Sequence, residues 1–327
     1  IICTMKGARS RPGLIKNKEK RQQVYAKLKL LKKKGKREKR GENKRRAVEA
    51  GELGCEPVKK KPKTLETERV NDPTFVKPQD DEVFGDEAGD EFASIFANTE
   101  KPKLMITTRP KPTKELFLFI GNLLQIFPKA YYYERKKFDV KQICGFASQK
   151  DFTHLVVLGE QDKQCNGMII SRLPHGPTAF FKVSNVELSS QLKHRGRQTG
   201  HMPEIILNNF TTRVGRRVGR FLGSLFPHEP EFKGRQAVTF HNQRDFIFVR
   251  HHRYIFDETE TDGKTDGKKA DSRNPVPGVK ARLQELGPRF TLKMRWLQLG
   301  SFDTKDGEYE WMHNRKAMDT DRRRFHL

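Results

Sequence analysis

The stretch RVGRRVGRFLGSLFP, residues 213–227, sorts its side chains only when it is wound as an α-helix. At about 100° of turn per residue, one face of this helix carries arginines, a second carries apolar side chains and a third carries only glycines. Pro227 marks the end of the helix. The arginine face holds Arg213, Arg216, Arg217 and Arg220, the apolar face Val214, Val218, Phe221, Leu222 and Leu225, and the glycine face Gly215, Gly219 and Gly223.

Two interpretations of this helix are open. In the first, it is an amphipathic helix whose arginines are simply solvated. In the second, it packs by its apolar face and presents the arginines to phosphates, which the guanidinium group binds in a bidentate manner. Gly219 and Gly223 would then allow the backbone of a sheet or of an RNA strand to come close.

The composition favours a polyanionic partner. The 327 residues are 34% hydrophobic and 33% charged, and 66 Lys and Arg against 41 Asp and Glu give a net charge of +25. Such a surplus is typical of proteins that bind nucleic acid and, less often, an acidic membrane surface. The longest charge-free apolar run, at 116–128, is shorter than the ~20 residues that span a bilayer, so we predict no membrane segment. Charge begins at Lys6, so we also expect no secretory signal peptide.

Charge divides the chain into segments. Residues 1–63 hold 23 Lys and Arg against 6 Asp and Glu, a net +17, and we predict a basic arm that is disordered or transiently helical. Residues 64–100 hold 2 against 11, a net −9, with Phe84, Phe92 and Phe96 interleaved. We interpret them as an acidic linker, and leave open that they dock onto a partner or shield a basic surface until RNA arrives. Residues 101–327 hold 41 against 24, again a net +17, and end in a basic tail at 303–327.

From residue 101 the pattern alternates between strands and helices, which indicates an α/β or α+β fold class. We expect helices at 114–128 and 213–226, and a hairpin over 237–257 that turns near 242–245. Residues 257–278 cannot build a core and are predicted to be a flexible insertion. Strands are expected at 102–108, 153–160, 167–174, 176–188 (one long strand or a pair), 203–210 and 287–302.

Two landmarks recur in the same order about 100 residues apart, a period too long for a solenoid. The stretch GPTAFFKVSNVEL at 176–188 aligns with GPRFTLKMRWLQL at 287–299, and LLQIFP at 123–128 aligns with LGSLFP at 222–227. We therefore predict an internal duplication, with halves at 101–192 and 203–302 packed about a pseudo-two-fold axis. In this alignment Phe181 matches Leu292, Val183 matches Met294 and Val186 matches Leu297.

The second half carries the basic surface. It has eleven arginines outside the insertion, whereas the first half has three. In the strand at 287–302, apolar side chains (Phe290, Leu292, Met294 and Trp296) alternate with Arg289, Thr291, Lys293 and Arg295. The equivalent outer face of the first half reads Thr178, Phe180, Lys182 and Ser184, and we expect that half to prefer protein. The alternative is a solvated sheet face.

We predict that the second half binds RNA, because basic residues interleaved with aromatic ones suit backbone contact and base stacking. Tyr254 and Phe180 are the stacking candidates. Beyond the helix arginines, the predicted RNA-binding residues are Arg289, Lys293 and Arg295 in the strand, Arg250 and Arg253 in the hairpin, and Arg322, Arg323 and Arg324 in the tail.

No motif for catalysis or for a cofactor is recognisable. The four cysteines form no C-x-x-C pair and the histidines show no ligand spacing, so we predict neither a metal site nor a cofactor. We expect Cys144 and Cys165 to be buried and to act as small apolar side chains. The phosphate-binding loop, the dinucleotide fingerprint, H-E-x-x-H and G-x-S-x-G are all absent. We therefore predict a protein that is not an enzyme.

The arginine-rich helix stretch resembles the sigma-like motif of the Brix domain, a module of ribosome biogenesis. ITTRPKP at 106–112 and FHNQRDFIFVRHHRYIF at 240–256 resemble the same domain, and the resemblance covers about 101–302. Beyond it, LGPRFTLKMRWLQLGSFDTKDGEYEW and MDTDRRRF resemble one member that acts on the large subunit. The first helix is more apolar than the family pattern, in which basic residues are usual there.

The resemblance implies two halves that are each similar to the anticodon-binding domain of class II aminoacyl-tRNA synthetases. It implies a non-enzymatic factor of the nucleus and nucleolus that binds precursor rRNA in the preribosomal particle and assists large-subunit assembly. It also implies a second large-subunit assembly factor docked on the Brix domain. The sigma-like motif places an RNA-facing role on Arg213, Arg216, Arg217 and Arg220. Three alternatives stay open: a protein scaffold with little RNA contact, an RNA-processing enzyme, and a membrane-surface protein that binds through residues 1–63.

Overall fold

The computed structural model describes residues 17–52, 62–70, 72–77, 80–258, 279–302 and 307–327. The described residues fall into two units, one up to Thr67 and the other from Glu68 onward. The first unit contains α1 (Lys18–Glu52), a helix with exposed Tyr25, Leu30 and Leu31. The sequence favoured disorder or a transient helix here. The structure is helical because Lys, Arg, Glu, Ala and Leu all have a high helix propensity.

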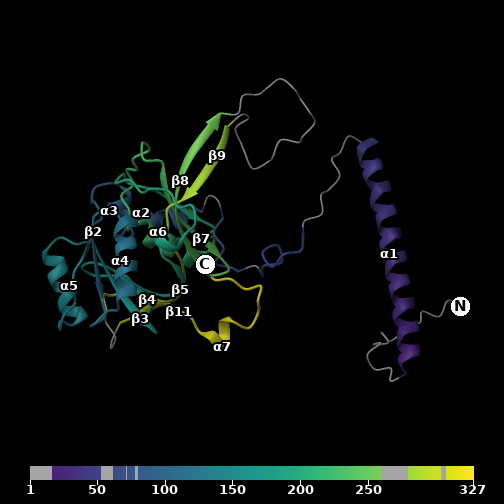
Figure 1. The fold of residues 1–327 in the computed structure, drawn as a ribbon, viewed down its shortest axis with the longest axis horizontal. Helices are drawn as coiled ribbons and strands as arrows, with labels where there is room; N and C mark the ends of the chain where they lie inside the picture. Colours follow the sequence, from purple (N-terminus) through teal and green to yellow (C-terminus); the bar gives the residue numbers. More distant parts are fainter. Residues whose placement is uncertain (1–16, 53–61, 71, 78–79, 259–278, 303–306) are drawn as a thin grey trace. The chain divides into compact units, whose positions relative to one another are not determined.

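The second unit is organised by one mixed sheet (Figure 1). Its strand order is β2-β1-β3-β4-β5-β10-β8-β7-β6, with β11 paired to β10 and β9 paired to β8. The predicted fold class is therefore confirmed. The strands are β1 (Leu104–Thr108), β2 (Ala130–Tyr132), β3 (His154–Gln161), β4 (Gln164–Arg172), β5 (Thr178–Glu187), β6 (Glu204–Asn208), β7 (Gln236–Gln243), β8 (Phe246–Glu258), β9 (Val279–Glu285), β10 (Arg289–Gln298) and β11 (Tyr309–Met312).

The two halves of the sheet meet at β5 and β10, which are antiparallel. Each half has a parallel strand pair, β1 with β3 or β6 with β7, followed by antiparallel strands. Phe181 lies opposite Met294, and Val183 lies opposite Leu292. This is the pairing that a two-fold axis requires when Phe181 is equivalent to Leu292 and Val183 to Met294. The strand pairing therefore repeats as the sequence alignment predicted.

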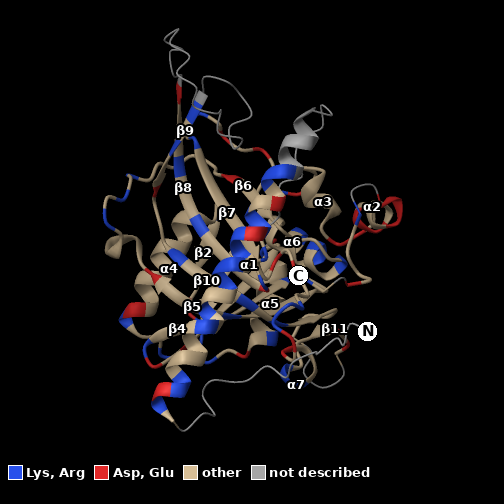
Figure 2. Ribbon diagram, turned by 90° about the vertical axis from the view of Figure 1, so that its right-hand side faces the viewer, with Lys and Arg blue, Asp and Glu red and all other residues tan. Residues whose placement is uncertain are grey.

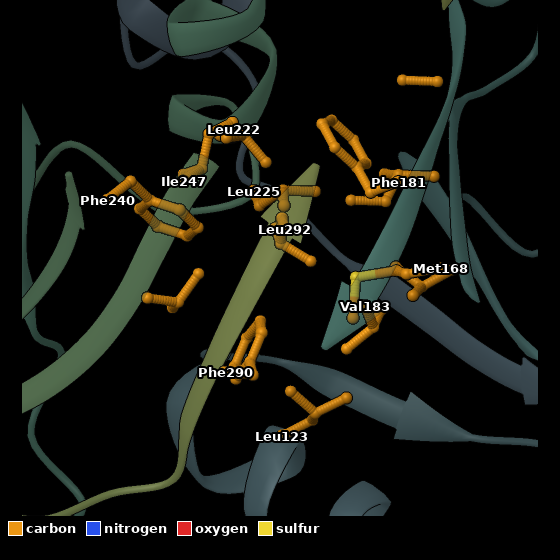
Figure 3. Close-up of a cluster of buried hydrophobic side chains, with 14 of the residues drawn as sticks. Leu123, Met168, Phe181, Val183, Leu222, Leu225, Phe240, Ile247, Phe290 and Leu292 are labelled. Atoms are coloured by element: carbon orange, nitrogen blue, oxygen red, sulfur yellow. The ribbon is translucent and has the colours of Figure 1, made fainter. Parts of the chain in front are cut away.

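The helices α4 (Lys114–Ile126) and α6 (Arg213–Gly223) contribute to one large apolar core on one face of the sheet. Figure 3 shows Leu123 of α4 beside Phe290 and Leu222 of α6 beside Ile247, in the same cluster as Phe181 and Leu292 of the central strands. The helix α5 (Val140–Gln149), which the sequence did not predict, packs on the opposite face through a second cluster. That cluster belongs to the first half. Among the described residues, no apolar cluster covers this face of the second half.

The strand β10 departs from the predicted alternation near its end. Its register against β5 shifts between Met294 and Trp296, which marks a bulge. After the bulge, Leu297 is buried in the core and Trp296 is half-buried beside Phe180, with ring centroids 5.8 Å apart. The prediction that Trp296 shares the face of Phe290 was therefore wrong.

The hairpin of β7 and β8 turns at Arg244 and Asp245, as predicted. The β8–β9 pair extends beyond the rest of the sheet (Figure 1). Residues 259–278, most of the predicted insertion, lie outside the described part of the chain.

Candidate nucleic-acid interface

The helix α6 forms where its sequence predicts it. The Thr212 hydroxyl caps the first turn by accepting a hydrogen bond from the Gly215 backbone N–H at 2.9 Å. Val218, Phe221, Leu222 and Leu225 are almost fully buried, and Val214 is half-buried against the same core. The predicted apolar face is confirmed.

The glycine face of α6 contacts this chain itself. A Cβ on Gly215 would lie 2.6 Å from the carbonyl carbon of Leu327. A Cβ on Gly223 would lie 3.0 Å from the ring of Phe96, and one on Gly219 would lie 3.4 Å from the ring of Phe210. The glycines therefore allow close packing of other protein segments, and the expectation that an RNA backbone approaches there does not match this arrangement.

The arginine face of α6 is covered by the acidic segment, which forms the helices α2 (Asp81–Ala88) and α3 (Ala93–Phe96). Three arginines make bidentate contacts: Arg216 with Glu87 at 2.7 and 3.0 Å, Arg217 with Glu91 at 2.7 and 3.0 Å, and Arg220 with Asp90 at 2.6 and 2.8 Å. Arg213 pairs with Glu82 at 2.6 Å. Figure 2 shows the acidic residues of α2 beside α6.

Each of the three bidentate arginines also faces an aromatic ring. The guanidinium carbon of Arg216 lies 5.4 Å from the centre of Phe84, that of Arg217 5.2 Å from Phe92 and that of Arg220 4.3 Å from Phe96. The hydrogen bonds from Arg217 hold the pKa of Glu91 below its usual value against the opposing effect of burial. The four arginines predicted to bind RNA are therefore occupied by carboxylates in this structure.

The acidic segment is more than a linker. Phe92 is 0% exposed and Ile95 is 1% exposed, and Phe92 belongs to the main core, where its ring lies 5.5 Å from that of Phe221. Residues 80–96 pack on α6 of the same chain and cover its arginines, which is the coverage of a basic surface that one alternative named. Docking onto a partner and release by RNA stay predictions.

Arg289, at the start of β10, is also neutralised. It binds Glu285 at 2.6 Å and Glu187 at 3.2 Å. The hydrogen bonds from Arg289 lower the pKa of Glu285. Of the predicted basic residues on this strand, Lys293 and Arg295 thus remain as candidates for binding an anion.

A second basic surface lies on the face of the sheet opposite α6, and we call it the open sheet face. Lys182 of β5 lies directly opposite Lys293 of β10 across the central strand pair. Among the described residues, no carboxylate lies within ion-pair distance of the four cations of this face, which are named at the end of this paragraph. Like charges that face each other across a strand pair are unfavourable, so a bound anion would stabilise this arrangement. The open sheet face comprises the cations Lys182, Lys293, Arg295 and Arg250 and the aromatic residues Phe180, Phe246 and Phe248.

Cations and aromatic rings alternate on the open sheet face. Lys293 Nζ lies 5.0 Å from the centre of Phe246, and the guanidinium carbon of Arg250 lies 5.8 Å from the centre of Phe248. Phe246 is 40% exposed and therefore accessible to a base. Nη1 of Arg295 lies 3.2 Å from Nδ1 of His313. Lys182 was not among the residues predicted to bind RNA, although its equivalence to Lys293 in the repeat is a signal that could have identified it.

A hollow of about 500 Å³ continues the open sheet face toward the first half. Arg109, Lys182 and Arg295 line it together with Phe180 and Asn166. Arg109 Nη1 donates to the backbone carbonyl of Glu160 at 2.6 Å, which fixes the position of its guanidinium group. The hollow thus brings Arg109, which the sequence did not single out, close to the cations of β5 and β10, although Arg109 also pairs with the buried Glu160 carboxylate at 3.9 Å.

The other predicted residues lie elsewhere. Arg253 pairs opposite the buried Gln236, and it lies three residues from Arg250, so the two point to opposite sides of β8. Tyr254 donates a hydrogen bond to Glu204. Arg322, Arg323 and Arg324 are exposed in the C-terminal segment, which is anchored by the buried Phe325 and Leu327.

The described residues contain no group of three or more His, Cys, Asp or Glu side chains placed to hold a metal ion. Cys144 and Cys165 are buried and unpaired by disulfides, and burial raises their pKa values to about 11 and about 12. Within the same residues, no helix combines the length and the apolar character needed to cross a membrane.

Comparison with known proteins identifies the relatives of this chain. Residues 109–296 match the Brix domain. The chain is 47% identical over 315 residues to "Ribosome production factor 1" of Pongo abelii, with 96% of this chain and 84% of that protein covered. It is 42% identical over 317 residues to "Probable ribosome production factor 1" of Drosophila melanogaster, with 96% and 74% covered. The crystal structure of a probable ribosomal biogenesis protein from Aeropyrum pernix K1 is similar with a TM-score of 0.39 and 14% identity, over 59% of this chain and 96% of that chain.

Proposed function

This chain belongs to the Brix domain family, and we propose that it is a non-enzymatic ribosome-biogenesis factor that binds precursor rRNA of the large subunit. The names of its relatives support a role in ribosome production. The net charge of +25 supports a nucleic acid as partner. In this proposal the protein acts in the nucleolus, within the preribosomal particle.

The observation that carries the proposed RNA binding is the open sheet face. Among the described residues, no carboxylate lies within ion-pair distance of its four cations, in contrast to the arginines of α6 and Arg289. Phe246 and Phe248 lie next to these cations and offer ring faces for stacking. Cations that bind phosphates and aromatic rings that stack on bases are the two elements of a single-stranded RNA surface.

The first half offers a different surface, which suits the second assembly factor that we expect as a protein partner. Tyr131, Tyr133, Phe138 and Phe146 are each between 42% and 48% exposed around β2 and α5. Phe138 and Phe146 contact each other edge to face, with centroids 5.5 Å apart. Exposed aromatic residues of this kind are typical of protein interfaces.

The proposal is tested by the salt dependence of RNA binding. The triple variant Lys182→Gln/Lys293→Gln/Arg295→Gln in the full chain is titrated with single-stranded segments of large-subunit precursor rRNA over a series of salt concentrations. Each lost phosphate contact lowers the slope of log K against log salt by about 0.7 for single strands, so we expect a loss of about 2.

The control has the same charge change. Lys114, Lys137 and Lys233 are exposed and lie outside the open sheet face, and all three are changed to Gln. The basic arm contributes equally to RNA binding by both variants. Equal slopes for the two variants would contradict RNA binding by the open sheet face. Turnover of the RNA in the presence of magnesium would contradict the non-enzymatic role.

A further inference from the structure

The α6 arginines are bound by the acidic segment in the two ways in which arginine binds RNA. We propose that residues 80–91 occupy a second RNA-binding site in cis, and that an RNA strand held on the open sheet face displaces them from α6. This inference rests on the proposed function, since it takes RNA as the competing ligand.

The contacts of the acidic segment imitate a nucleic acid. Each of Arg216, Arg217 and Arg220 receives a carboxylate along the edge of its guanidinium group and an aromatic ring on its face. Phosphates bind arginine edge-on in the same bidentate geometry, and bases stack on its planar face. Arginines that bind carboxylates along their edges and aromatic rings on their faces are therefore also suited to bind phosphates and bases.

The segment is anchored at its two ends, and between them it is attached mainly by its ion pairs. On one side, the Val76 N–H donates to the Thr211 carbonyl at 2.9 Å. On the other side, Phe92 and Ile95 are buried and Glu100 pairs with Arg172 at 2.5 Å. These anchors allow α2 to leave α6 as a tethered loop while residues 92–100 stay in place.

The contact between α2 and α6 is incomplete. Phe84 is 50% exposed, and only Val83 of α2 is buried among its described side chains. A hollow of about 340 Å³ lies between the two helices, lined by Val83, Val214 and Leu299 as well as by the arginines. Release of α2 therefore exposes little apolar surface. The ion pairs of the partly buried arginines provide most of the attachment, so a polyanion that binds the same guanidinium groups competes directly with the carboxylates.

The strand β11 connects the two RNA sites. It pairs with β10 beside Arg295, where Met312 lies opposite Trp296, and its Glu310 accepts a hydrogen bond from Arg217 at 3.4 Å. An RNA strand that is bound to the open sheet face and passes over β11 reaches α6 without leaving the protein. Binding at the first site thus raises the effective concentration of phosphate at the second.

The experiment follows the acidic segment directly. Hydrogen–deuterium exchange of the full-length wild-type protein is measured with and without a single-stranded RNA of mixed sequence, at a concentration where a parallel titration shows saturation. We expect faster exchange in residues 81–91 with RNA, and unchanged exchange in residues 92–96. Slower or unchanged exchange in residues 81–91 with bound RNA would overturn the inference and leave the proposed function intact. Absence of RNA binding in the titration would instead refute the proposed function.

Variants give a second, independent measurement. The change Glu87→Gln/Asp90→Asn/Glu91→Gln removes the carboxylates that make the bidentate contacts with α6. A control with the same charge change uses three exposed carboxylates away from α6: Glu115→Gln, Glu134→Gln and Glu231→Gln. We expect the first variant to bind the RNA more tightly than the control, with a salt slope steeper by about 2 because three arginines become available.

Adding Arg216→Gln/Arg217→Gln/Arg220→Gln to the first variant tests where the gain arises. We expect the gain to disappear in this combination. An equal gain in the control, or a gain that survives loss of the arginines, would overturn the inference because charge alone would then explain it. If the carboxylate variant does not fold, the exchange experiment on the wild-type protein decides.

Discussion

Phe92→Ala tests whether the acidic segment is part of the folded unit. Phe92 is 0% exposed and packs in the main core against Phe221, so its removal leaves a cavity between the segment and α6. Truncation of a buried Phe to Ala costs about 3–5 kcal/mol of unfolding free energy. Because residues 90–96 are a short surface segment that can settle into the space, we expect a value near the lower limit, about 3 kcal/mol.

The free energy of unfolding is measured by urea titration at fixed pH and salt, followed by tryptophan fluorescence. The chain has two tryptophans, Trp296 and Trp311, and both lie in the second unit outside the acidic segment. Phe232, which is 65% exposed, provides the control, and Phe232→Ala should cost less than about 0.5 kcal/mol. A Phe92→Ala protein as stable as this control would refute docking of the segment.

Two further predictions concern buried groups. Gly215→Ala should destabilise the protein by about 1–3 kcal/mol, because the new Cβ would lie 2.6 Å from the backbone of Leu327. Gly219→Ala should instead stabilise it by up to about 1 kcal/mol through helix propensity, because the nearest neighbour of that Cβ is 3.4 Å away. Unfolding temperatures of the two variants that shift in the same direction would contradict this. Burial lowers the pKa of His251 to about 4. Between about pH 6.5 and pH 4 the unfolded chain therefore binds a proton at this residue more readily than the folded chain does. The free energy of unfolding should decrease as the pH is lowered through this window, by about 1.4 kcal/mol per pH unit for this group. In urea titrations at pH 7 and pH 5, His251→Gln should reduce this loss without abolishing it, because the pKa of His154 is also lowered by burial; an unchanged loss would show that His251 does not contribute.

Local patterns in the sequence predicted much of the fold. The helix at 213–226 and the duplicated landmarks were recognisable because the positions of Arg, Val and Gly repeat with the helical period, and because GPTAFFKVSNVEL and GPRFTLKMRWLQL share their spacing. Short elements without strong periodicity were missed. The strand β2 has three residues and β11 has four, and their pairing depends on neighbours that only the folded sheet supplies.

The occupant of the α6 arginines could not be read from periodicity. The ion pairs join residues about 130 positions apart, so no local rule connects Glu87 with Arg216 or Asp90 with Arg220. The available signal was the spacing of Phe84, Phe92 and Phe96 between carboxylates, which permits docking without naming the surface. Likewise, the composition of the hairpin could not separate Arg250 from Arg253, because strand alternation sends them to opposite sides.

The distribution of charge explains why one basic surface of this domain is paired with carboxylates and the other is not. Residues 101–327 carry a net +17 and residues 64–100 carry −9, so together they carry +8. Carboxylates of the acidic segment pair with the arginines of α6. No carboxylate among the described residues lies within ion-pair distance of the cations of the open sheet face, and Asp319 acts on Lys293, and Glu285 and Glu187 on Arg250, only at longer range. A polyanion therefore meets an attractive surface first at β5, β10 and β8. In the proposed mode of binding, only an RNA long enough to pass β11 gains the arginines of α6 as well, and this would favour extended RNA over short polyanions without any readout of base sequence.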